Sequence, residues 1–216
     1  TNYGGAICSI MVPDKNGNYA NVIQGHDSID HVINSPEGYL STLIGRYGNR
    51  IANGKFELDG KEYQLAINNG PNSLHGGPTG YHARVWDAEQ TSPQSVKLHY
   101  LSADGEEGFP GNVNVKVTYT LTADNSIKLH YEGEADADTV LNMTNHAYFN
   151  LSGHGAGNLD DQKVCIYADR FTENDENCLP TGKILSVVGT PMDFREMQPV
   201  TARITEDDVQ LVRGNG

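Results

Sequence analysis

Residues 113–121 read VNVKVTYTL, a stretch in which apolar and polar side chains alternate. Because successive side chains of a β-strand point to opposite faces, this pattern predicts a strand with one buried and one solvated face. Residues 126–132, SIKLHYE, alternate in the same way after turn residues at 123–125. Together the two stretches predict a β-hairpin.

Most of the remaining chain has the same strand-and-turn character. We expect one more strand at residues 95–101 and two more hairpins, at 55–58 with 61–65 and at 7–12 with 20–23. Asp59-Gly60 suits the positive φ angles of a type I′ hairpin turn. Few residues show helical periodicity, and residues 32–43 could carry one short helical turn. Turns recur about every ten residues, which predicts one all-β domain, a sandwich or barrel, over residues 1–216.

The charge balance limits the possible partners. The chain has 15 basic and 28 acidic side chains, a net charge of −13. Nucleic acids and anionic membranes are bound largely through Lys and Arg, so we expect neither as a partner. No stretch approaches the ~18 apolar residues of a membrane-spanning helix. We also expect the protein to be cytoplasmic.

The cysteines and histidines give little support to a metal site. Cys8, Cys165 and Cys178 are widely spaced and form no CxxC motif, which argues against a disulfide framework or a zinc cluster. A single Cys165–Cys178 pair remains open. The eight histidines show no HExxH spacing, so no metal is expected.

Two polar, glycine-rich segments interrupt the alternation. Residues 45–51 read GRYGNRI and place two Arg and one Asn among glycines. Residues 68–78 carry His75 beside two glycines, which leaves the imidazole able to meet a ligand. Arg offers planar, permanently charged donors suited to hydroxyl or carboxylate groups. Plain surface loops are the alternative interpretation for both segments.

A third polar segment, residues 144–153, interleaves polar and aromatic side chains. If this segment is extended, His146, Tyr148 and Asn150 share one face. Their imidazole, hydroxyl and amide groups match the donors and acceptors of a carbohydrate. A hydrogen-bonded histidine in the protein core is the alternative.

Taken in order, these segments resemble the aldose 1-epimerase (galactose mutarotase) family. The resemblance runs nearly end to end, with landmarks at residues 45–51, 56–60, 63–65, 69–77, 86, 144–151 and 193–195. It implies a large antiparallel β-sandwich, the galactose mutarotase-like supersandwich, with a sugar cleft across one sheet. It also implies an isomerase that interconverts the α and β anomers of free hexoses such as galactose and glucose, with no metal or organic cofactor.

The resemblance also implies roles for five residues. His146 is the general acid at the ring oxygen, and His75 hydrogen-bonds the same region and helps to hold charge. Histidine suits this work because its unperturbed pKa of ~6.5 allows proton transfer near neutrality. Asn49 and Arg50 bind sugar hydroxyls, with Arg50 the more important, and Tyr148 contributes from the same segment as His146.

One part of the family pattern has no match. The family's general base is a Glu near the C-terminus of a longer chain, and its cleft also uses an Asp in a Gly-aromatic-Asp-His segment. The present sequence begins at Thr1 and stops at residues 212–216, where that segment would begin. We therefore expect a sandwich incomplete at its ends and inactive, or nearly so, by itself. Arg46 and Asn145 are expected to support the backbone.

Three other functions fit parts of the sequence. A non-catalytic carbohydrate-binding β-sandwich would not need the unmatched base. A hexose-6-phosphate 1-epimerase would need a further basic cluster for the phosphate, and none is evident. A glycoside hydrolase would need two carboxylates flanking one bond, whereas the polar segments here centre on His and Arg.

Overall fold

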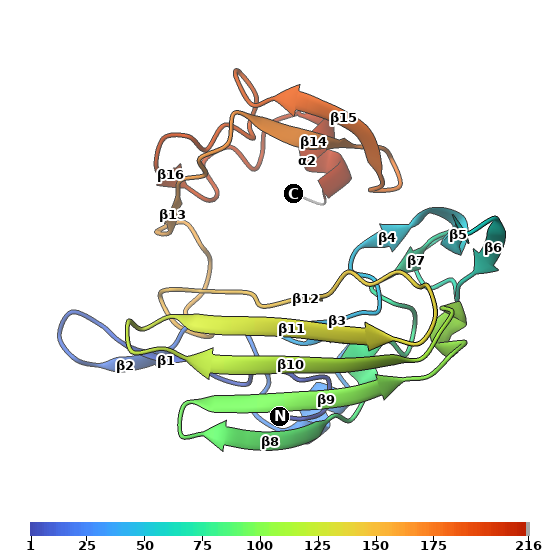
Figure 1. Cartoon of the computed structure of the whole chain (residues 1–216). Coiled ribbons are helices and arrows are strands. Elements are labelled where there is room, and N and C mark those ends of the chain that lie inside the picture. Colours follow the sequence, from blue (N-terminus) through green and yellow to red (C-terminus); the bar gives the residue numbers. More distant parts are fainter. Residues whose placement is uncertain (215–216) are drawn as a thin grey trace. The chain divides into compact units, whose positions relative to one another are not determined.

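A computed structural model describes residues 1–214 of the chain (Figure 1). Strands dominate it and the helices are short, so the all-β prediction is confirmed. The chain divides into two compact units. Unit 1 comprises Thr1–Ile10 and Ile23–Tyr148, and unit 2 comprises Met11–Val22 and the chain from Phe149 onward. The single domain over residues 1–216 stays a prediction, and its last residues, Asn215 and Gly216, lie outside the described residues.

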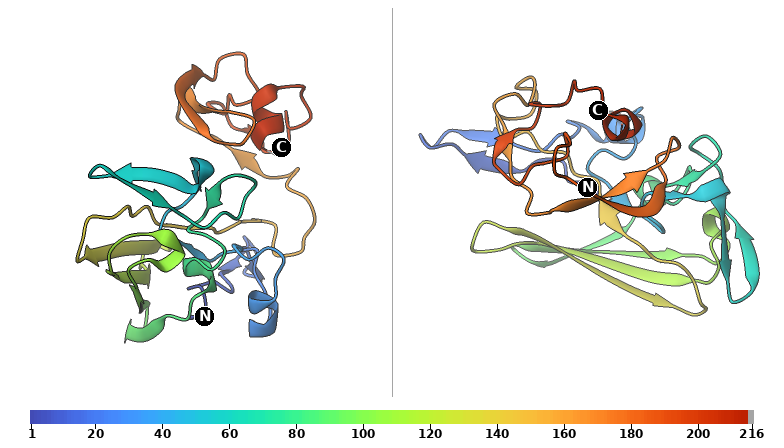
Figure 2. Two further views of the ribbon diagram at one scale, coloured as in Figure 1. Left: turned by 90° about the vertical axis from the view of Figure 1, so that its right-hand side faces the viewer. Right: turned by 90° about the horizontal axis from the view of Figure 1, so that it is seen from above.

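Unit 1 contains a four-stranded antiparallel sheet in the order β11-β10-β9-β8, which Figure 2 shows from two further directions. The strands of unit 1 are β3 (Leu43–Ile44), β4 (Arg50–Ile51), β5 (Lys55–Leu58), β6 (Lys61–Gln64), β7 (Ser73–Leu74), β8 (Asp87–Ser92), β9 (Ser95–Ser102), β10 (Val113–Leu121), β11 (Ile127–Ala135) and β12 (Thr144–Asn145). The predicted hairpin is β10–β11, with Leu121 opposite Ile127 beside the turn, and the predicted strand at 95–101 is β9. Both predictions are confirmed.

The core of unit 1 lies on one face of this sheet. Val113, Val115 and Val117 of β10 are buried there, as the alternation predicts. Burying each of these side chains contributes about 1.5–3 kcal/mol. Leu43 of β3 and Trp86 belong to the same core, and β3 pairs with β12. The pair β3–β12 therefore forms the second layer of a β-sandwich within unit 1 (Figure 1).

Short hairpins and helices complete unit 1. Strands β5 and β6 form the predicted hairpin, and Asp59 and Gly60 at its tip have φ angles of 53° and 74°. These positive angles are those that a type I′ turn requires. The helices are α1 (Ile29–Ile33) and the 3₁₀ turns η1 (Ala52–Gly54), η2 (Tyr81–Ala83) and η3 (Glu106–Gly108). Helix α1 begins earlier than the expected turn because the Ser28 hydroxyl accepts from the His31 N–H and caps it.

Up to residue 214, unit 2 contains three separate strand pairs and one helix. Its elements are β1 (Met11–Pro13) with β2 (Tyr19–Asn21), β13 (Lys163–Val164) with β16 (Gln198–Pro199), β14 (Arg170–Asn174) with β15 (Pro180–Ser186), and α2 (Val209–Gly214). The hairpin expected at 7–12 and 20–23 is thus shorter than predicted. The reason is that residues up to Ile10 belong to unit 1, where the Ile7 N–H donates to the Ser41 carbonyl.

Two further findings concern the sequence-based expectations. Cys8, Cys165 and Cys178 are all free thiols, so the Cys165–Cys178 bond left open above is not formed. Within residues 1–214, no helix combines the length and the apolar character that crossing a bilayer demands.

Candidate functional site

The pairing of β4 with β7 brings two of the polar segments together in unit 1. Arg50 lies opposite Leu74 in this pair, so Asn49 and His75 become neighbours just beyond it. The His75 N–H donates to the Asn49 carbonyl at 3.0 Å, and the Asn49 N–H donates to His75 Nδ1 at 2.9 Å. Two segments that are separate in sequence are thereby joined by a reciprocal pair of hydrogen bonds.

The second of these bonds determines the protonation of His75. Since Nδ1 accepts a hydrogen bond from a backbone N–H, the neutral ring carries its own proton on Nε2. Burial above all, together with the neighbouring His146, Arg50 and His82, lowers the pKa of His75 to about 4. At neutral pH, His75 is therefore an uncharged ring that offers an Nε2–H donor.

The pairing of β3 with β12 brings His146 to the same place. Beyond this pair the His146 N–H donates to the Thr42 carbonyl and the Ser41 N–H donates to the His146 carbonyl, both at 2.9 Å. The imidazole rings of His75 and His146 then lie edge to face, with their centroids 5.1 Å apart and their planes at 84°. The two histidines that the sequence singles out are thus adjacent.

The other predicted site residues lie beside this histidine pair. The ring of Tyr148 is half-exposed and lies 5.0 Å from that of His146, centroid to centroid. Arg50 Nε donates to Asn69 Oδ1 at 2.8 Å, and Arg50 Nη1 donates to Asn49 Oδ1 at 3.3 Å. These bonds hold the guanidinium next to the Asn49 side chain. All five predicted residues therefore gather in unit 1.

The extended conformation considered for residues 144–153 is only partly present. Strand β12 covers Thr144–Asn145, and Asn150 belongs to unit 2, where it is buried. Its Oδ1 accepts from Gln162 Nε2 at 2.8 Å. Asn150 thus has a structural role within unit 2, whereas His146 and Tyr148 belong to unit 1.

Two aromatic residues at the site escaped the sequence-based prediction. Tyr39 lies edge to face with both His75 and His82, with centroid distances of 4.8 and 4.6 Å. Burial lowers the pKa of His82 to about 4. Neither residue stands in a polar segment that drew attention. The sequence does place His82 seven residues after His75, but in a loop this spacing does not predict that the two side chains lie close together.

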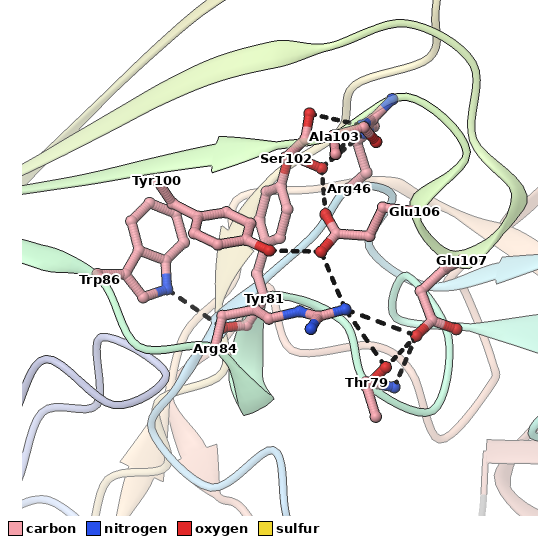
Figure 3. A network of polar contacts seen from close by, with 10 residues as sticks. All are labelled: Arg46, Thr79, Tyr81, Arg84, Trp86, Tyr100, Ser102, Ala103, Glu106 and Glu107. Atoms are coloured by element: carbon pink, nitrogen blue, oxygen red, sulfur yellow. Dashed lines mark hydrogen bonds and ion pairs between the residues drawn. The ribbon is translucent and has the colours of Figure 1, made fainter.

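Arg46 and Asn145 have the supporting roles expected of them. The Arg46 guanidinium is buried, and its Nη1 donates to the carbonyls of Pro110 and Gly111 at 2.7 and 3.0 Å. Its Nη2 donates to Ser102 Oγ at 2.7 Å (Figure 3). Asn145 Nδ2 donates to the Ser41 carbonyl at 3.2 Å.

The Ser102 hydroxyl accepts a hydrogen bond from Arg46 and donates one to the Glu106 carboxylate. Figure 3 shows Ser102 and Tyr100 both donating to Glu106, which also pairs with Arg84 at 2.9 Å. The N–H donors of the buried Arg46 guanidinium are thus satisfied, and the Glu106 carboxylate places a negative charge nearby. Because Arg46 is four residues before Arg50, this network anchors the segment that carries Asn49 and Arg50.

In residues 1–214, no three His, Cys, Asp or Glu side chains come together in a way that could hold a metal ion. The donors at the site are imidazole, guanidinium, amide and phenol groups. Groups of this kind donate hydrogen bonds to hydroxyl or ring oxygens, an imidazole can also transfer a proton, and a flat Tyr ring can cover an apolar sugar face.

Comparison with known proteins shows the family of this chain. The aldose 1-epimerase family model matches residues 1–214. The galactose mutarotase of Bos taurus is 44% identical over 194 residues, which are 90% of this chain and 56% of the relative. The aldose 1-epimerase of Escherichia coli K12 is 35% identical over 213 residues, 98% of this chain and 61% of the relative. The chain spans little more than half the length of these relatives.

Solved structures give the same result. The GalM/aldose epimerase homologue from C. elegans aligns with a TM-score of 0.87 at 34% identity, covering 93% of this chain and 61% of its own. The galactose 1-epimerase from Lactobacillus acidophilus also aligns at 0.87, with 28% identity, covering 100% of this chain and 62% of its own. The predicted mutarotase-like fold is confirmed, and the chain belongs to the aldose 1-epimerase family.

Proposed function

We propose that the site of unit 1 binds a free hexose and performs the ring-oxygen half of an aldose 1-epimerase reaction. The observation that carries the proposal is the edge-to-face pair of His75 and His146, 5.1 Å apart, with Arg50 and Asn49 beside it. The names of the relatives support the substrate class, since they are galactose mutarotases and aldose 1-epimerases.

The reaction needs one proton donor and one proton acceptor. A base removes the proton of the anomeric hydroxyl. The electrons of that O–H bond form the C1 carbonyl, and the bond between C1 and the ring oxygen breaks. His146 gives its proton to the departing ring oxygen. Rotation about C1–C2 and reversal of these steps yield the other anomer. Each positioned acid or base contributes about 10²–10⁴ in rate.

The remaining residues bind the sugar and stabilise charge. The Nε2–H of neutral His75 donates to the ring oxygen region, where negative charge develops before the proton arrives. Arg50 and Asn49 donate to hydroxyls, and the half-exposed Tyr148 ring covers an apolar sugar face. The proposal gives these five residues donor and binding roles, and it assigns the base acting at C1 to none of them. We expect the 216 residues alone to show little or no turnover.

Sugar binding is the first test. Titration of the 216-residue chain with galactose should show binding that weakens about tenfold or more in Arg50→Ala, because a charged donor to a hydroxyl is lost. Arg170→Ala in β14 of unit 2 is the matched control and should bind like the original chain. Glucose 6-phosphate should bind no more tightly than galactose. Equal loss in both Arg variants would refute the proposed site.

Catalysis is the second test, and it separates an epimerase site from a binding domain. Polarimetry of fresh α-D-glucose with the chain should follow the rate of buffer alone. Added acetate can act as the absent base, and we expect it to accelerate mutarotation with the original chain more than with His146→Gln. His130→Gln, a histidine change in β11, should retain the acceleration. A non-catalytic sugar-binding domain would show no difference between these proteins.

A further inference from the structure

Tyr39 lies where three histidine rings converge in unit 1. Its ring meets His75 and His82 edge to face, at interplanar angles of 71° and 63°, and faces His146 at 27°. The three centroid distances are 4.8, 4.6 and 6.2 Å. One phenol ring therefore contacts both histidines of the proposed hexose site and a third histidine that is buried.

The backbone around Tyr39 holds this ring in place. The Tyr39 carbonyl accepts from the Thr42 N–H at 3.1 Å and from the Thr42 hydroxyl at 2.9 Å. The next residue but one, Ser41, is bonded to the His146 backbone, as described above. The peptide that carries Tyr39 and the strand extension that carries His146 are consequently parts of one hydrogen-bonded layer.

Contacts on the other sides of the ring restrict it further. His82 is buried behind it, with its Nδ1 lacking a hydrogen-bond partner. The Tyr39 hydroxyl accepts from Asn68 Nδ2 at 3.3 Å. The same Asn68 amide binds both backbone groups of Leu74, with Leu74 N–H to Oδ1 at 2.7 Å and Nδ2 to the Leu74 carbonyl at 2.9 Å. Asn68 thus connects Tyr39 with the residue that precedes His75.

The Tyr39 ring at this position affects the charge state of the neighbouring His75 imidazole. Two charged imidazoles at 5.1 Å would repel each other, and the Arg50 charge adds to the repulsion at His75. The Tyr39 ring fills the space beside His75 with apolar surface that water would otherwise occupy. A desolvated imidazole stays neutral.

We propose that Tyr39 is a positioning residue of the hexose site: its ring sets the orientation of His75 and His146 and keeps water from the side of the pair. The catalytic meaning of this assignment rests on the proposed function. The assignment itself concerns the two imidazoles and can be tested without turnover.

The test compares Tyr39→Phe, which keeps the ring, with Tyr39→Leu and the unbranched Tyr39→Met, which remove it. NMR titration of the histidine ring signals in the 216-residue chain should give a His75 pKa of about 4 in the original chain and in Tyr39→Phe. In Tyr39→Leu and Tyr39→Met we expect a rise of about one unit or more toward 6.5, since water reaches the ring. Tyr63→Leu is the matched control, because Tyr63 is also partly buried but stacks on Phe56.

The outcomes decide the assignment as follows. An unchanged His75 pKa in the two ring-removing variants would overturn it, and so would an equal rise in Tyr63→Leu. For a measurement that needs no variant, ring protons of Tyr39 should show nuclear Overhauser contacts to His75 and His146 in the original chain, and their absence would also overturn it. If His75 responds as expected while galactose does not bind, the positioning role stands and the proposed function fails.

Discussion

At the residue scale, one backbone amide sets the tautomer of His75. The Asn49 N–H donates to Nδ1, so protonation of that nitrogen would have to break a bond of 2.9 Å. Burial and three positively charged or chargeable neighbours act in the same direction and bring the pKa to about 4. The Asn49 amide therefore selects the tautomer, and burial chiefly sets the charge, of a side chain that the proposed mechanism uses as a donor.

This state leads to a prediction on pH. Long-range proton–nitrogen NMR of the chain should show His75 as the neutral Nε2–H tautomer from pH 7 down to about 5. An unfolded histidine takes up its proton near pH 6.5, well above the folded value. His75 consequently makes the unfolding free energy fall as the pH drops from about 6.5 to about 4, and it has no such effect at higher pH. A doubly protonated His75 at pH 6 would contradict the assigned hydrogen bond.

At the element scale, the loops before β4 and after β7 interlock through glycines. Gly76 has a φ of +85°, and a Cβ there would lie 1.8 Å from the Gly45 carbonyl oxygen. That carbonyl also accepts from the Tyr81 N–H at 3.1 Å. The two loops that carry Asn49 and His75 can approach this closely only because a glycine stands at their contact.

Gly76→Ala should therefore destabilise unit 1 strongly. The Cβ must displace the Gly45 backbone, which adds about 1–3 kcal/mol of overpacking to the ~1–2 kcal/mol cost of a positive φ. Denaturant unfolding followed by the fluorescence of Trp86, which is buried in the core of unit 1, measures the effect.

Gly60→Ala provides the control for this measurement. Its φ is +74°, but no atom lies within 4 Å of its Cβ position. It should show only the strain of the positive φ angle. Equal losses of stability in the two variants would mean that the contact between the loops contributes nothing.

At the scale of the whole molecule, the net charge of −13 governs which partners can approach. Polyanions bind proteins chiefly through Lys and Arg contacts with phosphate or sulfate groups. The described basic side chains include Arg46 and Arg84, which are engaged with carbonyls and with Glu106. A free hexose carries no charge, so the acidic surface does not oppose its binding.

The charge predicts how the chain behaves on ion-exchange media. At about 50 mM salt, where electrostatic binding is strong, we expect retention on an anion exchanger and passage through immobilised heparin. Retention on heparin that is reversed by salt would contradict this expectation and would direct attention to a local basic surface.

Sequence and tertiary structure determined different parts of this picture. The alternation at Val113–Leu121 determines a strand with a buried face, because the period of the side chains is a local property. Asn49, Arg50, His75 and His146 were recognisable as candidate site residues because they stand in unusual polar segments.

Only the tertiary structure brought Tyr39 and His82 into the site. Their ring partners lie far away in the sequence, and the pairings of β3 with β12 and of β4 with β7 bring His146 and His75 to the same place. The neutral state of His75 likewise depends on burial and on the Asn49 N–H. Long-range strand pairing and desolvation are properties of the folded chain. The sequence alone therefore determined which functional groups are present, but not which residues surround them and shift their pKa values.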